Sequence, residues 1–175
     1  MWPGWEGRIM VTTDYVRLMA RYNTWQNASI YAAADTLTEA ERWQDRGAFF
    51  RSIHATLNHL LWADRMWMSR FAGLERPAQN INTSVDMISD WQDLKPARAA
   101  FDRVIEHWAA GLDSDWLAGD LTWFSGAIGR EVTKPAGLLV AHLFNHQTHH
   151  RGQVHAMLTA AGAQPGDTDM FLIDG

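Results

Sequence analysis

The sequence predicts an all-α protein, a four-helix bundle with a small hairpin before the last helix. Four long segments place apolar residues three or four positions apart, the spacing that gives a helix one buried face. Alternating strand patterns are almost absent, and no stretch repeats within the chain. A length of 175 residues suits one domain, so we assign residues 1–175 to a single domain whose first residues, 1–11, form an N-terminal extension.

The first predicted helix begins at an N-cap, Thr12 or Thr13, and runs to about Asp35. One face collects the side chains expected to be buried, namely Tyr15, Leu18, Met19, Tyr22, Gln26, Ile30 and Ala33. Residues 37–41 are expected to form a link or a short capped turn before Gly47 breaks the helical pattern.

The second predicted helix runs from about Ala48 to Ala72 and stops at Gly73. Its core side carries Phe49, Ile53, Leu57, Leu60, Trp67 and Phe71. His59 lies off the centre of that stripe, on a face that also holds three small residues, Ser52, Thr56 and Ala63. Small residues beside an imidazole indicate either the wall of a pocket or a close helix–helix contact. Asp64 lies among apolar neighbours, so if buried it needs a partner such as a ligand or an arginine.

Residues 74–84 are rich in turn-forming residues and are predicted to be a loop. A third helix follows and is broken near Pro96, which we place in a first turn because proline is tolerated there. Its apolar side carries Phe101, Val104, Ile105, Trp108 and Leu112, and His107 is expected at the surface. Residues 113–115 can cap a short helix, and the hairpin is expected from residues 121–124 and 126–130.

The fourth predicted helix, residues 135–162, carries five of the eight histidines. His146 and His150 are four apart and share a face with Leu139, Leu143, Val154 and Met157, so both should point inward. Such a pair can bind one metal ion, or each ring can be a core residue hydrogen-bonded to a neighbouring helix. The other histidines lie at the edge of this stripe or, for the last, on the opposite and solvated side: His142, His149 and His155.

Composition limits the chemistry that the chain can perform. Without cysteine, any metal site must use imidazole, carboxylate or water. A net charge of −5 argues against a nucleic-acid surface, which needs clustered Lys and Arg. No apolar run is long enough to cross a bilayer, and no signal-peptide pattern is visible, so we expect no membrane partner and a cytoplasmic location.

Several motifs together resemble the DinB family, also called the DinB/YfiT-like superfamily of metal-dependent four-helix bundles. The resemblance covers nearly the whole chain, from about Thr13 to Asp169. It rests on Tyr22-Asn23-x-Trp25-x-Asn27, Gly47-Ala48-Phe49-Phe50, residues 57–64 and residues 142–153. The resemblance implies a divalent metal held by one histidine of the second helix and two of the fourth. The matching positions are His59, His146 and His150, and the choice of His59 over His54 rests mainly on the resemblance.

The resemblance also implies zinc or nickel as the cofactor, although neutral nitrogen ligands accept iron or manganese as well. Related proteins are S-transferases and isomerases that use a low-molecular-weight thiol. We therefore consider two functions: a metal-dependent transferase or hydrolase acting on a small molecule, and a metal-binding protein without turnover, for sensing or sequestration. Ten tryptophans and the resemblance favour a homodimer. Residues considered for supporting roles are Asn58, Asp64, His142, Asn145, His149 and Gln153.

Overall fold

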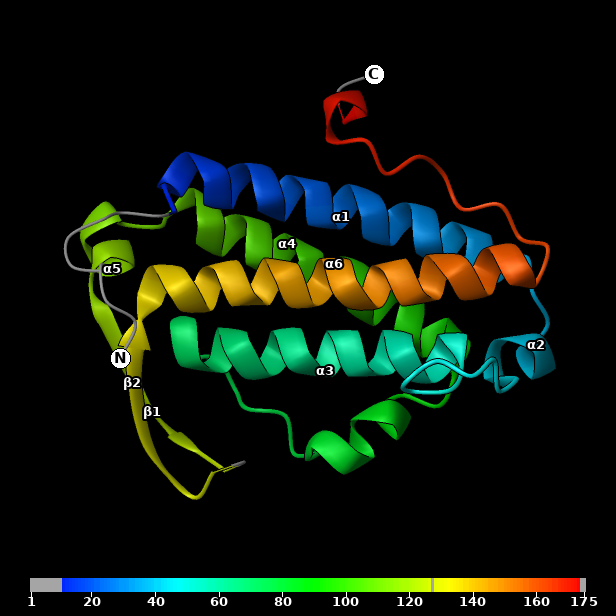
Figure 1. The fold of residues 1–175 in the computed structure, drawn as a ribbon, viewed down its shortest axis with the longest axis horizontal. Coiled ribbons are helices and arrows are strands. Elements are labelled where there is room, and N and C mark those ends of the chain that lie inside the picture. The colour runs from blue at the N-terminus through cyan, green and yellow to red at the C-terminus, as the bar shows by residue number, and fades with distance from the viewer. Residues whose placement is uncertain (1–10, 127, 174–175) are drawn as a thin grey trace.

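Four long helices lie alongside one another in the computed structural model, which describes residues 11–126 and 128–173 (Figure 1). They are α1 (Thr13–Asp35), α3 (Ile53–Phe71), α4 (Trp91–Ala110) and α6 (Ala136–Ala160). Helix α1 packs against α4 and α6, and α3 packs against the same two helices. The prediction of a mostly helical fold is confirmed, and none of the described helices is both long and apolar enough to cross a membrane.

Helix α1 begins where the sequence predicts, because the Thr12 hydroxyl accepts a hydrogen bond from the Tyr15 backbone N–H at 3.2 Å. Its buried face is rotated from the predicted one. Tyr15 and Leu18 are 38% and 36% exposed, whereas Asn23 and Asn27 are buried. The other predicted residues of this face, Met19, Tyr22, Gln26, Ile30 and Ala33, are buried as expected. The predicted face did not include the two asparagines, which apolar spacing does not identify. Of the predicted extension, residues 1–10 lie outside the described part of the chain, and Val11 is buried.

The link after α1 contains a short helix, α2 (Glu39–Trp43), capped by Thr38. The second long helix then begins at Ile53 and not at Ala48, because Ser52 caps it by accepting the Ala55 N–H at 3.1 Å. Phe49 therefore lies outside the helix and is 80% exposed, so its predicted place in the core is wrong. The predicted end of the helix is confirmed.

A 3₁₀ helix, η1 (Ile81–Asp86), lies in the segment predicted to be a loop and packs against α3. Helix α4 begins at Trp91, capped by Asp90, so Pro96 lies inside the helix and not in its first turn as predicted. The earlier start is anchored by the Trp91 indole, which donates to Asp35 at 2.7 Å. Val104, predicted to be buried, is 38% exposed.

The short helix and the hairpin before the last helix are both present. Asp113 caps α5 (Ser114–Ala118), and β1 (Asp120–Ser125) pairs antiparallel with β2 (Arg130–Pro135). The second strand begins at Arg130, later than predicted, and Gly129 immediately before it has φ +67°, a backbone conformation that glycine adopts without strain. Helix α6 follows β2 directly and ends near Gly162 as predicted. A short 3₁₀ helix, η2 (Met170–Leu172), interrupts the C-terminal loop.

Candidate metal centre

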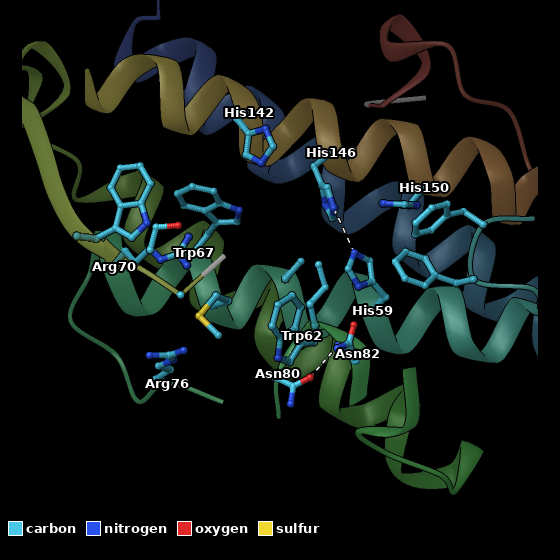
Figure 2. Close-up of a pocket in the computed structure, with 18 residues that line it drawn as sticks. His59, Trp62, Trp67, Arg70, Arg76, Asn80, Asn82, His142, His146 and His150 are labelled. Carbon is cyan, nitrogen blue, oxygen red and sulfur yellow. Dashed lines mark hydrogen bonds between the residues drawn. The ribbon is translucent and has the colours of Figure 1, made fainter. Parts of the chain in front are cut away.

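Three histidines from two helices meet at one point between α3 and α6 (Figure 2). His59 projects from α3, and His146 and His150 project toward it from consecutive turns of α6. Their ligand nitrogen atoms all lie within 4.8 Å of one another, and the Nε2 atoms of His59 and His146 are 3.3 Å apart. The structure therefore brings together the three histidines named from the sequence, in a cluster that could hold a metal ion.

Hydrogen bonds fix which nitrogen of His59 carries the proton. The Ser84 hydroxyl donates to the Ile81 carbonyl at 2.7 Å, so its oxygen accepts from His59 Nδ1 at 3.0 Å. Neutral His59 consequently keeps a lone pair on Nε2, the atom that faces His146. This is the usual arrangement of a metal-binding histidine, whose other nitrogen donates to a neighbouring oxygen.

His150 shows the same arrangement. Its Nδ1 lies 2.8 Å from Gln153 Oε1, an acceptor, so Nδ1 carries the hydrogen and Nε2 has the lone pair. Burial lowers the pKa of His59 and of His146 to about 3, with a further contribution from the neighbouring histidines, and it also lowers the pKa of His150. All three rings are therefore neutral at pH 7, as a divalent ion requires of its imidazole ligands.

The aromatic ring of Phe50, in the segment that connects α2 to α3, packs against His59. Phe50 stacks on His59 with 3.9 Å between ring centroids, and its centroid is 5.3 Å from that of His150. A tight turn places it there: the Arg51 N–H donates to the Ala48 carbonyl at 2.8 Å, and Arg51 has φ 67°. The sequence motif containing Phe50 thus supports the site, although Phe50 was not among the predicted site residues.

The three histidines line one end of a cavity of about 670 Å³. Tryptophan and methionine side chains cover much of its wall, together with His142, Arg70 and Arg76 (Figure 2). Among the described residues that line the cavity, none is Asp or Glu. A ligand entering the cavity would therefore meet imidazole nitrogens and cationic groups, without a competing carboxylate.

The family model of the DinB family matches residues 10–174 of this chain. The chain belongs to the DinB family. Protein DinB of Bacillus subtilis (strain 168) is 26% identical over 162 residues, which cover 91% of this chain and 94% of that protein. A DinB-like protein from Bacillus cereus ATCC 10987 has a similar crystal structure, with a TM-score of 0.61 and 18% identity over 82% of this chain and 91% of the other. This structural likeness supports the fold.

Other motif residues join Arg98 and Asp102 of α4 in a buried polar network beside the histidines. Asp64 on α3 pairs with Arg98 on α4 at 2.6 Å and also accepts a hydrogen bond from Gln147 on α6. Arg98 pairs with Asp102 at 2.8 Å. The network closes through α1, because Asn27 donates to Asp102 at 2.9 Å and Asn23 accepts from Arg151, which also donates to Gln147.

This network joins all four long helices and explains why α1 buries two asparagines. Asp64 thus has an arginine partner, one of the alternatives that the sequence left open. Burial raises the pKa of Asp64 to about 6, against the attraction of Arg98, so the carboxylate is ionised at neutral pH. It does not line the cavity, and its role is to hold the helices that carry the histidines.

Two of the three small residues beside His59 do not form a pocket wall. Ser52 caps α3, and the Thr56 hydroxyl donates to the Ser52 carbonyl at 2.7 Å, whereas Ala63 does line the cavity. Of the two alternatives that the sequence left open, the pocket wall therefore holds for Ala63 and not for the two hydroxyl residues, which bond to the local backbone. His54 bonds to the Ile88 carbonyl through Nε2 at 2.9 Å and lies outside the cluster.

The remaining candidates divide by position. His142 lines the cavity and packs edge-on against Trp67, with ring centroids 5.1 Å apart. His149 is exposed and lies 3.3 Å from the amide nitrogen of Gln153, so it is linked to His150 through that residue.

The two asparagines hydrogen-bond to the backbone and not to the histidines. Asn58 bonds to the N–H and the carbonyl of Ile88, and Asn145 donates to the Ala141 carbonyl in the preceding turn of α6. His155 is half-buried, so its predicted solvation is wrong, but it lies outside the cluster.

Ser84 is a second site residue, after Phe50, that the sequence did not reveal, since it lies in a segment predicted to be a loop. Replacing it in the variant Ser84→Ala should weaken metal binding by about 10- to 100-fold, because His59 loses the acceptor that fixes its tautomer and orientation. Competition with a chromogenic chelator measures this affinity.

The matched control is Ser69→Ala, which removes a hydroxyl from α3, the helix that carries His59. Among the described residues this hydroxyl donates to the Met66 carbonyl, at 2.8 Å, and to no histidine. Metal affinity in this variant should equal that of the wild type. Equal affinities in both serine variants would contradict the positioning role of Ser84.

Proposed function

We propose that this DinB-family protein binds one divalent metal ion through His59, His146 and His150 and acts as a metal-dependent enzyme on a small molecule. The convergence of three neutral imidazoles at one end of a cavity supports this proposal most directly. The reaction type that we favour is a thiol S-transferase, with a hydrolase as the second possibility. In either case the substrate, including a low-molecular-weight thiol, enters through the cavity.

The donor set fits a divalent ion of the later transition series. Three neutral nitrogen ligands suit zinc or nickel and accept iron or manganese. A divalent ion held by three neutral ligands keeps its full charge, which lowers the pKa of a water or thiol that it binds, to about 7 for water on zinc. The protein's own groups hold the ion, exclude bulk water with aromatic rings and orient the ligands through Ser84 and Gln153.

A second candidate function is metal binding without turnover, for sensing or sequestration. The observation that favours it is the lack of a carboxylate among the described residues that line the cavity, because hydrolysis generally uses a positioned general base.

For the catalytic function, His142 could act as the general base, because it lines the cavity and does not belong to the three-histidine cluster. Burial lowers the pKa of His142, which keeps it neutral at pH 7 and able to accept a proton.

A substrate screen separates the two functions. Metal-loaded protein is incubated with low-molecular-weight thiols plus electrophilic acceptors, and separately with hydrolysable esters and amides. We expect turnover by the wild type and by the control His155→Ala, and at least about tenfold slower turnover by His59→Ala at equal helix content, since a ligand is lost. Absence of turnover by metal-loaded wild type across the screen would reject the catalytic proposal in favour of metal binding alone.

We propose further that the four long helices form a four-helix bundle of the type found in this family, that the protein is cytoplasmic and that it forms a homodimer. Two large apolar side chains, Phe49 and Phe171, are 80% and 83% exposed and are available for a symmetric contact. Light scattering across micromolar concentrations should give twice the chain mass of 19.9 kDa. A monomer mass at all concentrations would contradict the dimer.

A further inference from the structure

One stripe of helix α3 runs along the whole cavity. Its residues follow helical spacing from the metal centre outward, at positions i, i+3, i+4, i+7, i+8 and i+11: His59, Trp62, Ala63, Met66, Trp67 and Arg70. With a rise of 1.5 Å per residue, the first and last are separated by about 16 Å along the helix axis. The cavity is therefore elongated, with histidines at one end, apolar side chains in the middle and Arg70 at the other end (Figure 2).

The guanidinium of Arg70 is held in place by two tryptophans. Its central carbon lies 4.4 Å from the Trp67 ring centroid and 5.5 Å from that of Trp123. Rings on its faces leave the N–H groups at the edge of the guanidinium plane available for an acceptor. Within residues 11–126 and 128–173, neither Arg70 nor Arg76 has a salt bridge to Asp or Glu.

Arg76 lines the same end of the cavity (Figure 2). Burial lowers the pKa of Arg70, and the positive charge of Arg76 lowers it further. The positive charges of Arg70 and Arg76 thus line the same end of the cavity, although the chain as a whole has a net charge of −5. Since like charges repel, this arrangement is stabilised most by an anion that enters between them.

The β-hairpin lines the end of the cavity that contains Arg70 and Arg76. Along β1 the half-buried side chains are Leu121, Trp123 and Ser125, and they alternate with exposed ones. Trp123 and Ser125 line the cavity, and Trp123 lies edge-on to Trp67 with ring centroids 5.8 Å apart. The hairpin therefore forms a wall of this end of the cavity and partly shields Arg70, which is half-buried, from water. Such shielding strengthens a charge-assisted hydrogen bond.

We propose that Arg70 and Arg76 bind the oxyanion head group of the substrate, a carboxylate or a phosphate, and that an apolar segment connects this group to the end that reaches the three histidines. The position of the reacting end rests on the proposed function. The anion subsite itself rests on the cavity, on the tryptophans around Arg70 and on two arginines that have no salt-bridge partner in the described part of the chain. It can be tested without a metal.

The test uses octanoate, octyl phosphate and neutral octanamide as probes of the full-length, metal-free chain. Chemical shifts of the Trp67 and Trp123 indole N–H groups, assigned with Trp→Phe variants, report binding next to Arg70. At least one anion should bind about tenfold more tightly than octanamide, the effect of a charge-assisted hydrogen bond, and the tighter anion identifies the head group. Equal affinity for all three probes would overturn the proposal.

Arginine variants show which residues cause the preference for an anionic probe over octanamide. Arg70→Met should reduce it to less than about twofold, Arg70→Lys should restore part of it, and Arg76→Met should weaken it. The matched control is Arg65→Met, because Arg65 is also half-buried on α3 and lies 5.7 Å from an aromatic centroid, that of Phe101, but does not line the cavity. A preference that persists without Arg70, or that is lost equally without Arg65, would overturn the subsite. If Arg70→Met loses its helix content, the affinities of Arg76→Met and Arg70→Lys for the three probes test the subsite instead.

A final comparison asks whether one molecule spans both ends. Zinc-loaded protein is titrated with 8-mercaptooctanoate and with 8-mercaptooctanamide, which differ only in the charge of the head group. The acid should bind about tenfold more tightly in the wild type and equally in Arg70→Met. Equal binding in the wild type, alongside an intact preference in the metal-free chain, would overturn the spanning substrate. A chain that binds no zinc but keeps the metal-free preference would reject the proposed function while supporting the anion subsite.

Discussion

Replacing His146 or His150 by alanine is expected to abolish stoichiometric metal binding, and His59→Ala should do the same. Each variant removes one of three nitrogens that lie within 4.8 Å of one another, and two imidazoles hold a divalent ion far less tightly than three. The loss should exceed the 10- to 100-fold expected when a supporting hydrogen bond is removed. Metal content after equilibrium dialysis, measured by elemental analysis, gives the result directly.

His155→Ala is the matched control, because His155 lies on the same helix and is half-buried but does not belong to the cluster. It should keep the full metal content. A second control, His149→Ala, tests the exposed histidine whose ring lies 4.9 Å from that of His150. Equal losses in His146→Ala, His150→Ala and His155→Ala would show that the metal lies on a different face of α6.

Replacing Asp64 by alanine is expected to lower the free energy of unfolding by about 3–5 kcal/mol. Asp64 is fully buried and accepts hydrogen bonds from Arg98 and Gln147, so its loss leaves a buried guanidinium with one carboxylate in place of two. Urea unfolding of the metal-free chain measures the change. Asp64→Asn should lose less stability, since it keeps the volume and one acceptor oxygen.

The control for this prediction is Asp14→Ala. Asp14 pairs with Arg17 at 2.8 Å, a separation like that of the buried pair, but its side chain is 89% exposed. Exposed pairs and charges in a first helical turn contribute below about 1 kcal/mol. A similar loss of stability in Asp14→Ala and Asp64→Ala would contradict the structural role given to the buried network.

The helices could be predicted because their apolar residues follow a period, whereas burial of polar residues could not. Asn23 and Asn27 lie in the core because they bond to Arg151 and Asp102, residues far away in the sequence. Hydrophobic spacing carries no information about such partners. The start of α3 was misplaced for a local reason, since Ser52 caps the helix and the positive φ of Arg51 separates it from the preceding aromatic pair.

Part of the candidate site could likewise be predicted from the sequence, and part could not. The inward pair His146 and His150 follows from a spacing of four on one helix, which sequence alone reveals. His59 required the family resemblance, because His54 is equally buried on the same helix. Ser84 reaches His59 only through the packing of η1 against α3, and no local pattern indicates that. Arg70 shares a stripe of α3 with His59, but that stripe does not reveal the hairpin residues that line the same cavity.

The metal content of the protein, purified without a histidine tag from medium supplemented with zinc and nickel, tests the central claim most directly. Elemental analysis should find about one divalent ion per chain, because three neutral imidazoles from α3 and α6, two buried and one half-buried, converge on one point. A chain that carries no stoichiometric metal after such growth, and takes up none on titration, would contradict the account.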